Sequence, residues 1–62
     1  MKYKIITESK TYGDDVFCET KDARWAENQL SWAFYWFKDT IVPEEGDVNE
    51  IIITFSTKKV TK

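Results

Sequence analysis

The first third of the chain alternates between polar and apolar positions in the manner of two short β-strands. Residues 2–8, KYKIITE, alternate with a period of two and are rich in β-branched side chains. Residues 16–20, VFCET, form a second short run, and Gly13-Asp14-Asp15 ahead of it has the residue types of a turn. The two runs are close enough in sequence to pair as a hairpin.

A helical period replaces the strand period after residue 20. With side chains placed about 100° apart, one stripe suited to face a sheet holds Ala23, Ala26, Leu30, Ala33, Phe34, Phe37 and Ile41. Either Thr20 or Asp22 supplies the N-cap. Because Pro43 disfavours helical angles at the residue before it, the helix is predicted to run from about residue 22 to residue 41.

The most strongly apolar run lies near the C-terminal end. Residues 50–60, EIIITFSTKKV, contain three consecutive isoleucines, which is typical of a strand that is covered on both faces or central in a sheet. The order strand, strand, helix, strand predicts an α+β fold, in which a three-stranded sheet packs against one long helix within a single domain, 1–62. A right-handed crossover would allow the third strand to pair parallel with the first.

Three tryptophans lie on the predicted helix outside the stripe that faces the sheet. Trp25, Trp32 and Trp36 fall within about 40° of one another, with Gln29 between them and Tyr35 at their edge. This second stripe points roughly 130–150° away from the first, so one helix and one sheet cannot bury both. Tryptophan and tyrosine are also the residue types that dominate binding hot spots.

Three interpretations of the second stripe stay open. A different helix register, or a loop of residues 9–15 or 42–49 folded over the rings, would make the tryptophans ordinary core. Self-association would bury them against a second copy, giving a homodimer. A foreign protein would bury them directly. Soluble monomers rarely leave such large apolar patches uncovered, which fits both self-association and a foreign partner.

Charge is unevenly distributed although the net charge is only −2. Residues 39–50 hold acids and no base, whereas the C-terminal end is basic. Direct binding of nucleic acid needs a concentrated basic face, which this sequence lacks. Acidic turns are often merely solvated. If they bind a basic partner instead, the acids predicted for that role are Asp14, Asp15, Glu44, Glu45 and Asp47.

The residue types on which many enzymes depend are missing. The chain has no histidine, which removes the common neutral-pH base and the Ser-His and Cys-His arrangements. Cys18 lies in a predicted strand without a basic neighbour, as an inert buried thiol does. One cysteine without histidine forms no usual zinc site, and the two glycines form no phosphate loop. We therefore expect no catalytic residue, no metal and no cofactor.

The compartment is predicted from the cysteine content and from the apolar runs. A lone cysteine rules out an internal disulfide and fits a reducing compartment. The apolar run near Met1 is too short for a signal peptide, and no window approaches the ~20 apolar residues of a membrane span. We expect a cytoplasmic protein with no membrane partner.

Two known families share features with the chain. MKYKIITESKT and DARWAEN, residues 1–11 and 22–28, look like the first strand and the helix start of the immunoglobulin-binding domain of streptococcal protein G. That domain ends in a hairpin for which this chain lacks the fourth strand. The resemblance therefore implies a shared architectural pattern only.

The second resemblance is to the small inhibitors of uracil-DNA glycosylase encoded by relatives of phage phi29. It rests on size, acidity, the order of elements and the closing segment VNEIIITFSTKKV, residues 48–60. It implies a phage protein that is a homodimer of three-stranded sheets with one helix each, mimics DNA with acidic groups and traps an apolar enzyme side chain in an aromatic pocket. The Phe-Glu-x-x-Tyr helix motif of that family is absent here, so no functional residue is carried over.

These observations together predict a non-enzymatic protein-binding module. The first hypothesis is a small acidic inhibitor of a DNA-binding enzyme such as uracil-DNA glycosylase, acting through the aromatic helix surface and DNA-mimicking acidic loops. The alternative is a structural or regulatory homodimerising domain with no inhibitory role.

Overall fold

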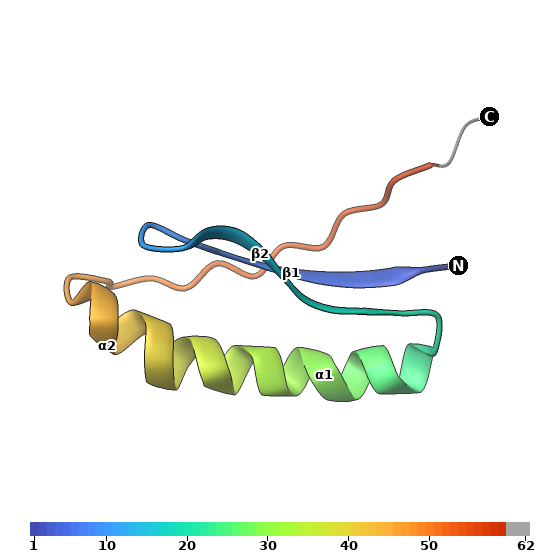
Figure 1. The fold of residues 1–62 in the computed structure, drawn as a ribbon, viewed down its shortest axis with the longest axis horizontal. Helices are drawn as coiled ribbons and strands as arrows, with labels where there is room; N and C mark the ends of the chain where they lie inside the picture. Colours follow the sequence, from blue (N-terminus) through green and yellow to red (C-terminus); the bar gives the residue numbers. More distant parts are fainter. Residues whose placement is uncertain (60–62) are drawn as a thin grey trace.

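The computed structural model describes residues 1–59 and shows an antiparallel hairpin laid along a long helix (Figure 1). The elements, in chain order, are β1 (Tyr3–Ser9), β2 (Gly13–Thr20), α1 (Ala23–Trp36), the π-helical segment η1 (Phe37–Ile41) and α2 (Val42–Glu45). Residues 46–59 follow as an extended segment without regular secondary structure. The α+β class predicted from the sequence is confirmed.

The hairpin forms where the alternating pattern placed it. β1 and β2 pair antiparallel, and β2 starts at Gly13, whose φ of 70° lies in the left-handed region that glycine adopts easily. The register shifts between Ile5 and Ile6, so Phe17 on β2 is the extra residue of a β-bulge. A bulge re-aims side chains, and here Phe17 and Cys18 are both half-buried although they are neighbours in sequence.

The start of α1 depends on Asp22. This residue has extended backbone angles, and its Oδ1 accepts hydrogen bonds from the backbone N–H groups of Arg24 at 2.9 Å and Trp25 at 3.1 Å. Two of the N–H groups that lack partners at a helix start are thereby satisfied. Of the two caps left open by the sequence, Asp22 is the N-cap, while Thr20 accepts a hydrogen bond from the Asp22 N–H.

The helical path continues beyond residue 41, so the predicted end is wrong. In η1 the N–H of Val42 bonds to the carbonyl of Phe37, five residues back, which widens the helix just before Pro43. A widened turn accommodates a proline that can donate no hydrogen bond and would crowd the preceding turn. The path ends only after Glu45, where Gly46 has φ 84° and its N–H bonds to the Val42 carbonyl.

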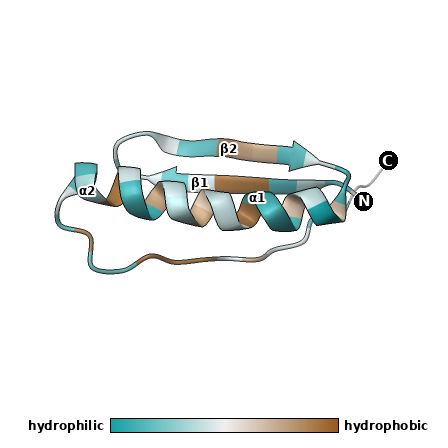
Figure 2. Cartoon of the chain, turned by 90° about the horizontal axis from the view of Figure 1, so that it is seen from below, coloured by the Kyte–Doolittle hydropathy of each residue, from teal (hydrophilic) through white to brown (hydrophobic). Residues whose placement is uncertain are grey.

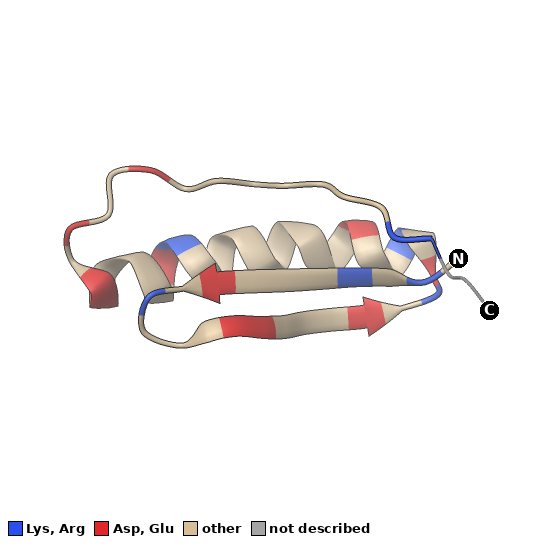
Figure 3. Ribbon diagram, turned by 90° about the horizontal axis from the view of Figure 1, so that it is seen from above, with Lys and Arg blue, Asp and Glu red and all other residues tan. Residues whose placement is uncertain are grey.

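Within residues 1–59 the predicted third strand does not form, and the sheet has two strands, β1 and β2. Val60, the last residue of the predicted strand, lies outside the described residues. Residues 50–59 are extended but belong to no ladder. The segment runs on the β1 side of the molecule in the direction opposite to β1, whereas the parallel arrangement that the sequence left open would run the other way (Figures 1 and 3). In that direction the basic ends of β1 and of the segment lie at the same end, and like charges facing each other across two strands oppose pairing.

The core of the subunit is small. The buried apolar residues among those described are Ala26, Ala33 and Ile41, and all three belong to the predicted helical stripe. Phe34, which was predicted to fill the core, is 40% exposed. Figure 2 shows apolar colouring in the middle of both strands and along the extended segment. The isoleucines of that segment are exposed and lie outside the core. A subunit this poorly filled has little stability to spare.

Loss of the N-cap is therefore expected to be visible in the stability of the whole subunit. Asp22→Ala leaves two N–H groups without their acceptor and should lower the free energy of unfolding by about 1 kcal/mol. Asp22→Asn keeps an oxygen acceptor and should stay close to the wild type. Urea denaturation followed by circular dichroism measures both, and equal stability of Asp22→Ala and wild type would contradict this role of the cap.

Candidate functional site

One side of α1 carries an aromatic face, which we define as Trp25, Gln29, Trp32, Tyr35 and Trp36. Trp25 and Trp32 lie two helical turns apart, with Gln29 between them, because seven residues return nearly to the same side of a helix. Trp32 is 60% exposed and Trp25 is 52% exposed. No other described residue therefore covers the larger part of either indole.

Trp36 joins the aromatic face to the hairpin. Its ring lies 5.7 Å from that of Phe17, measured between centroids, and it is the least exposed of the three indoles at 37%. The contact exists because the bulge in β2 turns Phe17 toward the helix. Trp36 therefore supports the fold as well as the aromatic face.

Tyr35 closes the other edge of the aromatic face. Its ring is 50% exposed and meets that of Phe34 edge-on at 5.8 Å. The Lys38 ammonium lies over both rings, 5.3 Å from the centroid of Tyr35 and 5.9 Å from that of Phe34. Such contacts between a cation and an aromatic ring are weakly attractive at exposed sites. The aromatic face is therefore bordered by the positive charge of Lys38 on this side.

A second surface forms where the turn of the hairpin meets the end of the helix. The Tyr12 hydroxyl donates a hydrogen bond to Glu44 Oε2 at 2.9 Å, and the Thr11 N–H donates one to Glu45 Oε1 at 3.1 Å. Lys10 pairs with Asp47 at 3.6 Å. These contacts bring both predicted acidic groups to one end of the molecule, where Figure 3 shows the red positions of β1, β2 and α2 together.

This acidic end, defined as Glu8, Asp14, Asp15, Glu44, Glu45 and Asp47, contains a repulsive pair. Glu8 on β1 is directly opposite Asp14 on β2. Like charges directly opposite each other destabilise a hairpin, and both side chains are exposed. The subunit therefore keeps an arrangement that its own stability does not favour, which is common at binding sites.

A pocket of about 270 Å³ lies between the two surfaces. Its walls come from the hairpin, the end of α1 and η1, and include Thr7, Tyr12, Asp15, Trp36, Phe37 and Thr40. Trp36 belongs to the aromatic face and Asp15 to the acidic end, so the pocket connects them. A partner that touches both surfaces would also cover this pocket.

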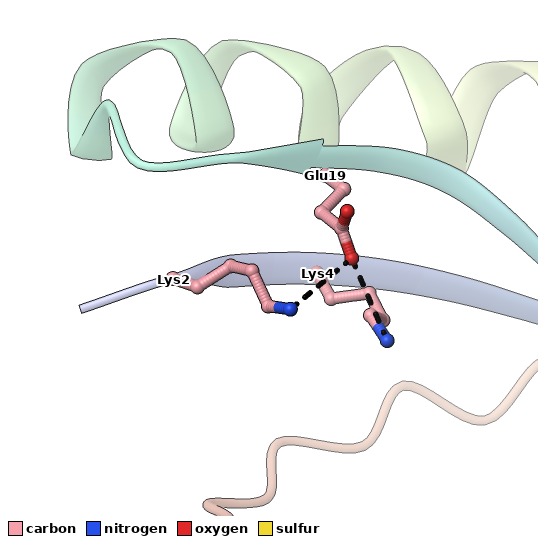
Figure 4. A network of polar contacts seen from close by, with 3 residues as sticks. All are labelled: Lys2, Lys4 and Glu19. Atoms are coloured by element: carbon pink, nitrogen blue, oxygen red, sulfur yellow. Dashed lines mark ion pairs between the residues drawn. The ribbon is translucent and has the colours of Figure 1, made fainter. Parts of the chain in front are cut away.

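The opposite end of the hairpin has a different charge pattern. Glu19 on β2 lies between two lysines, with its Oε1 3.5 Å from Lys2 Nζ and 3.6 Å from Lys4 Nζ (Figure 4). All three side chains are about half exposed. Exposed ion pairs of this kind contribute little to stability. Because two lysines face one glutamate, this end has a local excess of positive charge.

The described residues offer little to hold a metal ion. Within residues 1–59 no group of three or more Cys, Asp or Glu side chains is arranged for metal binding. Cys18 is half-buried and faces Ile5 across the hairpin, which is the environment of a packing residue. None of the helices in this part of the chain has the length and apolar composition needed to cross a bilayer.

Sequence reasoning missed several residues that build these surfaces. Tyr12 and Thr11 carry no signal in the sequence pattern, although they fix the end of the helix to the turn. Glu8 was placed in a strand without its acidic neighbour. The roles of Tyr12 and Thr11 depend on contacts with residues more than thirty positions away, which no local pattern contains. The bulge at Phe17 likewise has no signature in a single sequence.

Comparison of the chain with protein-family models, with curated proteins and with solved structures finds no match in any of the three. The chemistry of the two surfaces is therefore the basis for assigning a function.

The contact between Tyr12 and Glu44 has a measurable consequence. The hydrogen bond to Glu44, and then the negative charge of that carboxylate, raise the pKa of Tyr12 above its ordinary value of 10.0. A raised folded-state pKa means that the folded chain holds this proton more tightly than the unfolded chain. The stabilising contribution is thus complete below about pH 10 and is lost as the pH rises through the folded-state pKa.

Alkaline titration followed by tyrosine absorbance tests this contact. Glu44→Gln removes the charge and should move the pKa of Tyr12 down toward its ordinary value, while Tyr12→Phe identifies the transition that belongs to this residue. If Glu44→Gln titrates like the wild type, the hydroxyl and the carboxylate are not in contact in solution.

Proposed function

We propose that the protein is a non-enzymatic protein-binding module whose principal contact surface is the aromatic face. The observation that carries this proposal is the exposure of Trp25 and Trp32, each more than half accessible on a subunit of 62 residues. Each such ring buries on the order of 150–250 Å² when covered. Tryptophan is the residue type most often found among the few that dominate binding energy.

The acidic end supports a partner with a basic groove. Its carboxylates lie at one end of the elongated subunit, beside the pocket that leads to Trp36. A DNA-binding enzyme presents basic sites for successive phosphates, which carboxylates can occupy in place of DNA. We therefore propose that the module inhibits a DNA-binding enzyme such as uracil-DNA glycosylase, with the acidic end in the phosphate sites and the aromatic face as an apolar anchor.

A second candidate is a regulatory or structural homodimer without inhibitory activity. The accessible surface of the chain is 5690 Å², whereas a folded monomer of 7.4 kDa exposes about 4200 Å². The radius of gyration of 13.0 Å likewise exceeds the ~11 Å of a compact domain of this length. Such an excess of surface favours a subunit that is covered by another molecule, and a second copy is one such molecule.

Titration calorimetry against purified uracil-DNA glycosylase tests the first proposal. We expect binding that DNA competes with, and that weakens when the salt rises from about 0.1 M to about 1 M, because the Debye length falls from ~10 Å to ~3 Å. Trp32→Ala should weaken binding roughly thirtyfold, the loss of about 2 kcal/mol expected at a hot spot.

Two control variants belong to this experiment. Ser31→Ala changes the polar side of the same helix and should bind like the wild type. Asp14→Asn with Asp15→Asn should weaken binding and reduce its salt dependence, whereas Glu27→Gln, an exposed acid outside the acidic end, should not. The inhibitor proposal is wrong if the enzyme does not bind at low salt, and the DNA-mimicry part is wrong if binding is independent of salt.

Sedimentation equilibrium separates the two candidates at the aromatic face. If that face were the self-interface, Trp25→Ala and Trp32→Ala would both dissociate the wild-type assembly. An inhibitor needs the face free for its target, because a ring buried against its own copy cannot contact the enzyme. We therefore expect both variants to keep the association state of the wild type.

A further inference from the structure

The pocket between the aromatic face and the acidic end has the size of a site for one small group. Its volume of about 270 Å³ corresponds to about nine water molecules at ~30 Å³ each. Pockets that enclose drug-sized ligands measure roughly 300–1,000 Å³. A single long side chain, or a free molecule of that size, therefore fits, whereas a larger ligand does not.

The backbone is irregular on both sides of this pocket. The helical side is η1, whose π-helical turn contributes Phe37, Thr40 and Ile41 to the walls. The hairpin side contains Gly13, which has a φ of 70° and adds no side chain to the wall. π-Helical turns are rare and frequently lie at functional sites. The location of this turn on a pocket wall therefore favours a binding role for the pocket.

Hydroxyl groups line the pocket beside its aromatic wall. Thr7 Oγ1 donates a hydrogen bond to the Asp15 carbonyl at 3.5 Å, and Ser9 Oγ accepts one from the Tyr12 N–H at 3.0 Å. A hydroxyl oxygen has two lone pairs and one proton. Among the contacts of the described residues both oxygens therefore keep a lone pair, which a ligand rich in N–H donors can use.

The charge of the pocket is negative. Asp15 is the charged side chain in its walls, and within residues 1–59 neither a lysine nor an arginine forms an ion pair with it. Tyr12, on the same wall, holds the Glu44 carboxylate at 2.9 Å. The described residues form no group of three possible metal ligands, whereas Ca²⁺ needs roughly six to eight oxygen ligands. The pocket is thus suited to an organic cation rather than to a metal ion.

A guanidinium group matches these walls better than an ammonium group does. It is planar, stacks on aromatic rings such as Trp36 and binds a carboxylate through two parallel N–H groups. Its remaining N–H donors need acceptors, which the hydroxyls of Thr7, Ser9 and Thr40 supply. An ammonium ion is compact and strongly hydrated, so it gains less from a flat indole. Phe37 provides apolar surface for the stem that carries the guanidinium.

We propose that this pocket binds a guanidinium group on a short apolar stem, with the cation against Asp15 and Trp36. The group has two possible sources, a free small molecule and an arginine side chain on a bound polypeptide. Both present the same chemistry to the pocket. The site does not depend on whether uracil-DNA glycosylase is the target, because its own walls define it.

Fluorescence of Trp36 reports binding in this pocket. Replacement of the two more exposed indoles, Trp25→Phe with Trp32→Phe, leaves Trp36 as the only tryptophan. Butylguanidinium is the probe, and butylurea, which has the same shape without the charge, is its matched control. At about 0.15 M salt the Debye length is ~8 Å, so distant acids contribute little. We expect butylguanidinium to bind about tenfold more tightly than butylurea, because its bonds to Asp15 are charge-assisted.

Variants of the walls locate the cation. Asp15→Asn should weaken binding of butylguanidinium about tenfold and remove the preference over butylurea. Asp14→Asn removes the same charge from the adjacent residue, which does not line the pocket, and should leave binding within about twofold of the parent. Thr40→Phe fills part of the cavity and should abolish binding, whereas Thr40→Ser keeps the hydroxyl and should leave binding unchanged.

Three results overturn the proposal. The first is equal binding of butylguanidinium and butylurea. The second is an equal loss of binding with Asp14→Asn and Asp15→Asn, which would indicate a general attraction of cations to the acidic end. The third is a Trp36 signal that does not respond to the probe, or that responds equally in the Thr40→Phe variant.

A peptide arm distinguishes the two sources of the guanidinium. The probe is a five-residue peptide with blocked ends, one central arginine and glycine elsewhere. Tighter binding of this peptide than of butylguanidinium assigns the group to a polypeptide, and weaker binding assigns it to a free molecule. Either result supports the site. Binding of uracil-DNA glycosylase is measured separately, so failure of the inhibitor proposal would not change these outcomes.

Discussion

The structure of this chain is governed by a shortage of internal surface. One helix and two strands can face each other only along one stripe of the helix and one side of the hairpin. Within the described residues that contact buries Ala26, Ala33 and Ile41, and it leaves every large aromatic side chain at least partly in solvent. Since hydrophobic burial scales with the area removed from water, much of the chain's apolar surface can contribute to stability only when another molecule covers it.

Apart from that core, the chain is held together by a helix cap, by polar contacts and by one aromatic contact between the hairpin and the helix. Asp22 starts the helix, a bulge brings Phe17 to Trp36, and the turn is tied to the helix end by hydrogen bonds to Glu44 and Glu45. The last of these has two effects. It fixes the orientation of the hairpin on the helix, and it gathers carboxylates that repel one another at one end, so the fold and the acidic surface have the same origin.

The sequence was informative wherever a pattern acts within a few residues. Period two and turn chemistry identified the hairpin, and period 3.6 identified the helix and the three residues that are buried. Its errors arose where a contact over distance decides. A π-helical turn accommodates Pro43, and the isoleucine run at 51–53 is extended but not paired. Helix geometry placed the indoles outside the stripe that faces the sheet but left open whether a loop covers them. The joining of two acidic segments needed Tyr12, whose partner is distant in sequence.

The separation of the surfaces along the molecule has a mechanistic consequence. The aromatic face lies on α1, with Trp36 against Phe17 of β2, while the segment 50–58 runs on the β1 side of the hairpin (Figures 1 and 3). A molecule bound at one surface need not displace a molecule bound at the other. Because binding to the folded state alone stabilises it by mass action, each contact would raise the population of subunits folded for the next. Low stability of the isolated chain is then an advantage. The apolar area that stays exposed in the isolated chain is the same area whose burial favours binding.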